Sequence, residues 1–301
     1  MNRRNFIRKS VAVAATACYG LKGTARPVIA GPGAKSKNRI GIQLYSIHDK
    51  LPSDHEGCLK KLSAIGYSCA EAYGFDGNVF LNKRLKEWSR MLNDAGMQLS
   101  GTHCGTGMLP ADVHTAEWDY WRKSIDEMNA AGGKRLTQSF LPAGKTADEA
   151  KRTAEQFNRI GELCKAGGIK FGYHNHYSEF KPVDGEVIYD LLIRNTDPGL
   201  VFFQMDLGHV VNGGGDILTY LRNYPGRFLS WHASDFKKGQ GYTEVGQGDV
   251  PYDALFEQAA SYGLEELIVE QETGGDIYAS CKKDFDVLSK YPWTKQSASH
   301  H

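Results

Sequence analysis

The histidines of this chain are not scattered over its sequence. Of its 10 histidines, five stand at the end of an apolar run or within a few residues of it: His103, His174, His176, His209 and His232. Aspartates and glutamates stand in similar places. A set of one Asp, one Glu and two His can enclose one divalent cation and leave positions open for substrate oxygens. Because such a cation polarises a carbonyl group and eases removal of the neighbouring proton, these residues predict metal-assisted enolisation.

The polar residues follow segments that have the apolar character of β-strands. The expected strands are Ile40–Ser46, Ser68–Tyr73, Gln98–His103, Arg135–Phe140, Lys170–His174, Val201–Asp206, Phe228–His232 and Leu267–Glu270. Helical patterns alternate with them. The expected helices are Asp54–Ile65, Leu81–Ala95, Glu117–Ala131, Thr146–Ala166, Val187–Arg194, Ile217–Asn223, Tyr252–Tyr262 and Tyr278–Ser289.

Eight such alternations predict an α/β fold, a single (β/α)8 TIM barrel over residues 38–293. Gly66, Gly96 and Gly263 stand just before the next strand, where glycine commonly ends a helix. In such a barrel the C-terminal ends of the strands meet at one mouth, so the polar residues converge. A doubly wound open sheet is the alternative. However, the segment after the first strand, Gln43–Ile47, contains no Gly-x-Gly-x-x-Gly motif.

The bulk composition is that of an ordinary globular protein, with 41% hydrophobic and 24% charged residues. The 36 basic and 35 acidic residues nearly cancel, so we expect no nucleic-acid partner. The cysteines have no metal-type spacing, and an odd number follows Cys18, so no disulfide framework is predicted. No oligomeric state is predicted.

The first residues differ from the rest of the chain. Arg3 and Arg4 precede a short apolar run, which is the form of a twin-arginine export signal, placed at residues 1–20. The run has roughly half of the ~20 residues that a spanning helix needs. A linker is expected at 21–37 and a disordered tail at 294–301. We expect a periplasmic or extracytoplasmic protein, held at the membrane only if Cys18, in a degenerate lipoprotein box, is lipidated.

Several short motifs together resemble one known family. They are Gly41–Ser46, Gly66-Tyr67-x-x-x-Glu71, Asp206-x-x-His209, Trp231-His232-x-x-Asp235, Val245–Val250 and Glu270. With these motifs the chain resembles the xylose isomerase-like barrels, also called the sugar phosphate isomerase/epimerase or endonuclease-four-like group. The resemblance extends from about Arg39 to Pro292. It implies a carbohydrate substrate and one divalent metal ion, such as Mn, Zn, Mg or Co.

The resemblance also implies a ligand set. The family holds its metal with an acid on strand five, Asp on strand six, His on strand seven and Glu on strand eight. The last three correspond to Asp206, His232 and Glu270. On strand five, where the epimerases have Glu-Asn-His, this chain has His174-Asn175-His176. We expect His174 as the fourth ligand and keep His176 as the alternative. The His-Asn-His form resembles a subgroup common in secreted proteins.

The departure on strand five bears on proton transfer. Family epimerases use paired glutamates of strands five and eight as acid and base, and a metal-bound histidine is a poor base. The catalytic candidates are therefore Glu270, Glu272, Glu179 and His176. The residues expected to contact substrate or support the site are Glu71, His103, Gln138, His209 and Asp235. Tyr45, Trp231 and Phe236 are candidates to line an apolar sugar face or to pack in the interior.

The predicted function is that of a divalent-metal-dependent sugar isomerase or epimerase that enolises a keto-sugar. A 3-keto-glycoside lyase or hydratase of the same fold is the alternative, and export favours it because sugar phosphates are not available outside the cytoplasm. No glycine-rich phosphate cradle is evident. A non-catalytic sugar-binding barrel is the alternative from another class. A nucleic-acid enzyme of the endonuclease-four branch is disfavoured by the balanced charge.

Overall fold

The computed structural model describes residues 40–295. The expected export signal, the linker and Cys18 lie outside these residues. Thr294, assigned to the tail from the sequence, is instead buried, and its hydroxyl donates to the carbonyl oxygen of Tyr291 at 2.8 Å. It lies in the short 3-10 helix η3 (Pro292–Lys295), with which the described chain ends.

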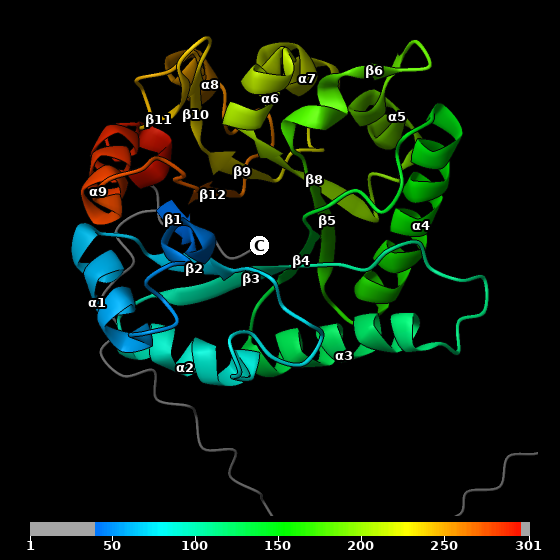
Figure 1. The fold of residues 1–301 in the computed structure, drawn as a ribbon, viewed down its shortest axis with the longest axis horizontal. Helices are drawn as coiled ribbons and strands as arrows, with labels where there is room; N and C mark the ends of the chain where they lie inside the picture. The colour runs from blue at the N-terminus through cyan, green and yellow to red at the C-terminus, as the bar shows by residue number, and fades with distance from the viewer. Residues whose placement is uncertain (1–39, 296–301) are drawn as a thin grey trace, which may run out of the picture. The chain divides into compact units, whose positions relative to one another are not determined.

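Eight parallel strands close into a barrel, and the predicted (β/α)8 fold is confirmed (Figure 1). Going around the barrel, the strands are β1 (Ile40–Gln43), β12 (Glu266–Val269), β9 (Ser230–Ala233), β8 (Val201–Asp206), β5 (Lys170–His174), β4 (Arg135–Gln138), β3 (Gln98–Cys104) and β2 (Cys69–Ala72). In this order β1 and β5 are four places apart, so they lie on opposite sides of the barrel.

Helices alternate with the strands and surround them in Figure 1. They are α1 (His55–Ile65), α2 (Leu85–Asp94), α3 (Ala116–Ala131), α4 (Ala147–Ala166), α5 (Ile188–Asn195), α6 (Leu207–Gly213), α7 (Ile217–Asn223), α8 (Tyr252–Glu257) and α9 (Ile277–Leu288). Two antiparallel hairpins extend from the connections. One pairs β6 (Pro182–Val183) with β7 (Glu186–Val187), and the other pairs β10 (Asp235–Lys237) with β11 (Gly241–Thr243).

Three of the local differences from the predicted elements concern the first strand and two helices. The first strand ends at Gln43, whose side chain accepts the Tyr45 N–H at 3.2 Å and starts the 3-10 helix η1 (Leu44–Ile47). Helix α6, a helix of seven residues, was not predicted. It begins where Asp206 accepts the His209 N–H at 2.7 Å. Helix α8 ends at Glu257, before the predicted end at Tyr262.

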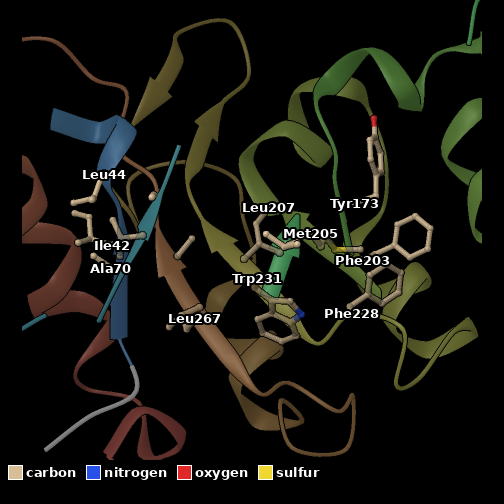
Figure 2. Close-up of a cluster of buried hydrophobic side chains, with 14 of the residues drawn as sticks. Ile42, Leu44, Ala70, Tyr173, Phe203, Met205, Leu207, Phe228, Trp231 and Leu267 are labelled. Carbon is tan, nitrogen blue, oxygen red and sulfur yellow. The ribbon is translucent and has the colours of Figure 1, made fainter. Parts of the chain in front are cut away.

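Side chains that alternate along the strands separate an outer apolar layer from a polar interior. Figure 2 shows part of the apolar layer, in which Tyr173, Phe203 and Phe228 pack against one another. The alternate position Gln204 instead bonds to Glu71 of β2, at 3.0 Å, and to Ser230 of β9, at 3.1 Å. Because these groups are buried, each must find its partner within the barrel. The barrel interior is therefore a hydrogen-bonded platform beneath the C-terminal strand ends.

Candidate active site

A cavity of about 310 Å³ opens at the C-terminal ends of the strands. A volume near the lower end of the ~300–1,000 Å³ typical of small-molecule sites suits a small ligand. The predicted convergence of residues from distant strands is present in this cavity. Its lining consists of Tyr45, Tyr73, Gly74, His103, Ser139, His174, His176, His209, Glu270 and Glu272.

Four side chains converge at the cavity and below it: His174, Asp206, His232 and Glu270. One ligand atom from each lies within 4.8 Å of the others, and all four side chains are buried. Nε2 of His174 is 4.0 Å from Oε2 of Glu270, and Nδ1 of His232 is 2.7 Å from the same oxygen. Two imidazoles and two carboxylates can hold one divalent cation.

The loops after β5 and β8 hold two of these side chains in place. Asn175 clamps the backbone of Asp206: its Oδ1 accepts the N–H at 3.1 Å, and its Nδ2 donates to the carbonyl oxygen at 3.3 Å. Oδ1 of Asp206 accepts the Ser234 hydroxyl at 2.6 Å as well as the His209 N–H. Sequence reasoning gave Asn175 no role. Because Asn175 directly follows His174, its two hydrogen bonds connect the end of β5 to the backbone of Asp206.

Glu71 lies beneath this cluster, outside the lining of the cavity. Its carboxylate accepts from Gln43 and is within hydrogen-bond distance of His103 and His232. Burial alone would raise the pKa of Glu71, but the imidazoles of His103 and His232 hold it well below its usual value. Burial disfavours a protonated His232, yet Glu270 and Glu71 outweigh it and raise its pKa to about 10. The structure therefore places Glu71 as a support for His232.

The residues present fit a divalent cation. Besides the mixed donor set, Nδ1 of His174 is buried without a hydrogen-bond partner, which is costly for a polar atom that binds nothing. Two all-histidine groups also converge, and both contain His174. Neither brings a carboxylate to balance the charge of a cation, so the group with Asp206 and Glu270 suits it better.

Two further groups in the cavity lie outside this four-residue cluster, and their surroundings shift their pKa values in opposite directions. Burial and the neighbouring His209 lower the pKa of His176 below its ordinary value. Burial and the negative charge of Glu270 raise the pKa of Glu272 above its ordinary value. One group suited to accept a proton and one suited to donate it therefore face the same cavity.

His209 and His103 also line the cavity, as expected for residues that contact a substrate. Nδ1 of His209 is hydrogen bonded to the hydroxyl of Tyr242, a residue of the β10–β11 hairpin that sequence reasoning missed. Nε2 of His103 lies 2.7 Å from Oε1 of Gln204 in the barrel interior. Tyr242 belongs to no sequence motif. It lies in the connection after β9, and the β10–β11 hairpin brings its hydroxyl to His209 of α6.

Glu179, a candidate base, lies outside the cavity lining. Its carboxylate accepts the hydroxyls of Tyr173 and Ser178, both at 2.5 Å, and the His176 N–H at 2.9 Å. These bonds occupy both oxygens. In the structure Glu179 therefore holds the turn after β5 and positions His176.

Two expected substrate contacts also lie outside the lining. Asp235 accepts four backbone N–H groups, from Phe236, Gly246, Gly248 and Val250, and so holds the motif Val245–Val250 in place. Gln138 donates to the carbonyl oxygens of Thr106 and Phe140. Both side chains shape loops around the cavity.

Of the three aromatic candidates, Tyr45, Trp231 and Phe236, only Tyr45 lines the cavity. Tyr45 lines the cavity, together with Tyr73, which sequence reasoning did not single out. Trp231 is fully buried and packs against Phe256, because it alternates with the inward-facing His232. Phe236 contacts Tyr242 edge-on, with 5.3 Å between the ring centroids. The structure thus assigns a cavity position to only one of the three.

A TIM barrel with a histidine and carboxylate cluster at its C-terminal mouth is the class that fold and site define. Residues 59–290 match the family described as xylose isomerase-like TIM barrel, and the chain belongs to this family. The resemblance noted in the sequence is thereby confirmed. No helix of the described residues is apolar over a length sufficient to cross a bilayer.

The chain is similar to enzymes named inosose dehydratase. It is 30% identical to that of Clostridium perfringens over 144 residues, 42% of this chain and 48% of the enzyme. The chain thus spans about half the length of this curated relative. With that of Geobacillus kaustophilus the identity is 23% over 87% of this chain and 93% of the enzyme. A crystal structure titled sugar phosphate isomerase/epimerase, from Parabacteroides distasonis, is 29% identical, with a TM-score of 0.76 over 85% of this chain and 99% of that chain. The names of these relatives are those of sugar isomerases or epimerases and of dehydratases.

Proposed function

We propose that this protein is a metal-dependent keto-sugar lyase, which removes the proton beside a ketone and expels a substituent from the next carbon. The observation that carries the proposal is the distribution of carboxylates in the cavity. Both carboxylates of its lining, Glu270 and Glu272, follow β12, whereas His174 at the end of β5, His176 after β5 and His209 after β8 supply imidazoles to the lining. A paired set of carboxylates on opposite faces, which an epimerase would use, is not part of this lining.

Elimination needs one base and one acid, and the cavity offers both. The neutral imidazole of His176 accepts the proton from the carbon beside the ketone. The electron pair of that C–H bond forms a carbon–carbon double bond, and the bond between the next carbon and its oxygen substituent breaks. The carboxyl group of Glu272 protonates the departing oxygen. The products are an unsaturated ketone and one molecule of water or alcohol.

His174, Asp206, His232 and Glu270 would hold the cation. When bound there, a divalent ion supplies polarisation of the substrate ketone, which makes the neighbouring proton more acidic. Mn, Zn, Mg and Co are the candidate ions, because nitrogen and oxygen ligands accommodate each of them. Glu71 orients His232 from below.

A neutral carbohydrate is the proposed substrate. The lining of the cavity contains no Lys or Arg, the side chains that commonly bind a phosphate group. Dehydration is the activity in the name of the inosose dehydratases, which supports elimination. The name of the Parabacteroides structure supports an isomerase or epimerase as the second candidate.

Incubation of the purified protein with oxidised glycosides, with Mn, Zn, Mg or Co added or chelated, tests the proposal. We expect metal-dependent release of the alcohol and formation of an unsaturated ketone, followed by ultraviolet absorbance and NMR. An epimerised or isomerised product without elimination would favour the second candidate. Binding of the sugar without turnover under all metal conditions would favour a sugar-binding barrel.

Export across the cytoplasmic membrane is a further part of the proposal. It is supported by Arg3 and Arg4 before a short apolar run, and a lipid on Cys18 would attach the mature protein to the membrane. A protein outside the cytoplasm meets glycosides more readily than sugar phosphates. The proposed location therefore agrees with the proposed substrate.

A further inference from the structure

The exposed large apolar side chains of residues 40–295 are concentrated on one face of the barrel. They are Tyr45, Met108, Val113, Phe140 and Tyr177. Each lies in a connection that follows the C-terminal end of a barrel strand, namely β1, β3, β4 or β5. Scattered exposed apolar residues need no explanation, but a concentration on the face that bears a cavity indicates a binding surface.

Two of these side chains are rings held in place beside the cavity. Tyr45 lines the cavity and stacks on His48 with 4.6 Å between centroids, while Tyr73 meets it edge-on at 5.4 Å. Tyr45 is nonetheless 42% exposed. A ring that neighbours fix before a ligand arrives loses little conformational entropy on binding.

Tyr177 is the second such ring, and it is 44% exposed. Its centroid lies 6.1 Å from that of His209, which lines the cavity, and the ammonium group of Lys181 lies 5.3 Å from the ring centroid. Tyr177 follows β5 and Tyr45 follows β1, on the opposite side of the barrel. Tyr45 thus lines the cavity on one side, and Tyr177, outside the lining, lies beside His209 on the other side.

The cavity suits one sugar ring, so a second ring joined to the first must emerge at this mouth. We propose that Tyr45 and Tyr177 bind the leaving group of the substrate, which is a glycoside whose leaving group carries a ring, either a second sugar or an aromatic group. This inference rests on the proposed elimination, in which that group departs. Tyr177 directly follows His176, and its ring is close to that of His209, so a ring bound at this side lies beside an imidazole of the cavity lining.

Binding of unoxidised glycosides, which lack the ketone that elimination requires, tests the subsite without turnover. The probes are methyl β-glucoside, phenyl β-glucoside and cellobiose. Methyl β-galactoside, phenyl β-galactoside and lactose form a second series. The dissociation constants are measured by calorimetric titration of the full-length protein loaded with Mn. We expect the wild type to bind a ring-bearing probe at least fivefold more tightly than the methyl glycoside of the same sugar, as one stacking contact would give.

The variants Tyr45→Ala, Tyr177→Ala and the double variant should reduce this preference, each ring contributing about threefold to tenfold. Val113→Ala is the matched control, since Val113 is exposed on the same face but carries no ring on which a probe could stack, and it should keep the preference. A stronger loss for the phenyl glycoside than for cellobiose identifies an aromatic leaving group, and the reverse identifies a sugar.

Absence of any preference in the wild type, or a full preference in the double variant, overturns the subsite. A double variant that changes only the oligomeric state overturns it as well, because the rings would then belong to an interface between copies. Failure of the elimination assay with an intact binding preference would refute the proposed reaction and leave the subsite in place.

Discussion

Nε2 of His232 lies 2.8 Å from Oε2 of Glu71, and both side chains are fully buried. The contact joins β9 to β2, across the interior of the barrel. It fixes the ring so that Nδ1 is directed at Glu270, 2.7 Å away. A carboxylate behind an imidazole is the usual arrangement that orients a metal-binding histidine and strengthens it as a ligand.

Replacement of Glu71 should therefore weaken metal binding without removing a ligand. We expect Glu71→Ala to lower the affinity for Mn or Zn by about tenfold to a hundredfold, and Glu71→Gln to lower it less, because the amide retains a hydrogen-bonding oxygen. Competition with a chelating dye measures the affinity. Equal affinities for the wild type and both variants would show that His232 does not need this support.

Removal of a proposed ligand should have a larger effect. We expect His232→Ala and Asp206→Ala to lose the bound metal in elemental analysis and to lose activity by on the order of a thousandfold or more. Circular dichroism serves to show that the variants fold. A full complement of metal in both folded variants would refute the site.

Variants of His176 and Glu272 should separate removal of the α-proton from departure of the leaving group. Without loss of metal, His176→Gln should slow both turnover and exchange of the substrate's α-proton with solvent deuterium by about a hundredfold to ten-thousandfold. Glu272→Gln should slow turnover but keep the exchange, and a nitrophenyl leaving group should rescue it, since such a group departs without an acid.

Glu179→Gln is the matched control for these two variants, because Glu179 is a carboxylate near His176 but lies outside the cavity lining. It should affect exchange less than His176→Gln does. Wild-type exchange and turnover in all three variants would exclude this scheme and leave Glu270 as the remaining base candidate.

The stability of the fold should depend on Asp284 near neutral pH. Burial raises the pKa of Asp284 to about 7, although the Val245 N–H and the Gln271 amide donate to its carboxylate at 2.8 and 2.7 Å. Its ordinary value is 3.8. Between these values the folded state binds more protons than the unfolded state, so this group makes the free energy of unfolding fall as pH rises from about 4 to about 7.

In Asp284→Asn this contribution disappears, and the free energy of unfolding should fall less steeply over the same pH range. Urea denaturation at several pH values measures the slope. Asp286→Asn, which changes an exposed carboxylate on the same helix, should keep the wild-type slope. A slope in Asp284→Asn as steep as that of the wild type would contradict the burial argument.

Export should depend on the two arginines near the start of the chain. We expect the double variant Arg3→Lys, Arg4→Lys to accumulate in the cytoplasm, as measured by cell fractionation. If Cys18 is lipidated, Cys18→Ala should move the mature protein from the membrane fraction to the soluble fraction. Unchanged extracytoplasmic localisation of the lysine variant would exclude a twin-arginine route.

The barrel itself was predictable from the sequence because its signals are local. Apolar runs alternate with helical patterns, and glycines such as Gly96, with a positive φ of 80°, end helices where the pattern stops. The position of polar residues after these runs was equally visible. The set of His174, Asp206, His232 and Glu270 was implied by the family resemblance, and the structure brings these four side chains together.

Only the tertiary structure distinguished carboxylates that look alike in sequence. Glu71 lies within β2 and is bonded beneath His232, whereas Glu270 directly follows β12 and reaches the cavity. Glu179 is occupied by Tyr173 and Ser178, and Glu272 faces the cavity. The physical reason is that a buried carboxylate takes its role from its hydrogen-bond partners and its depth. Strand register and loop packing determine both, and they join residues that are far apart in the chain.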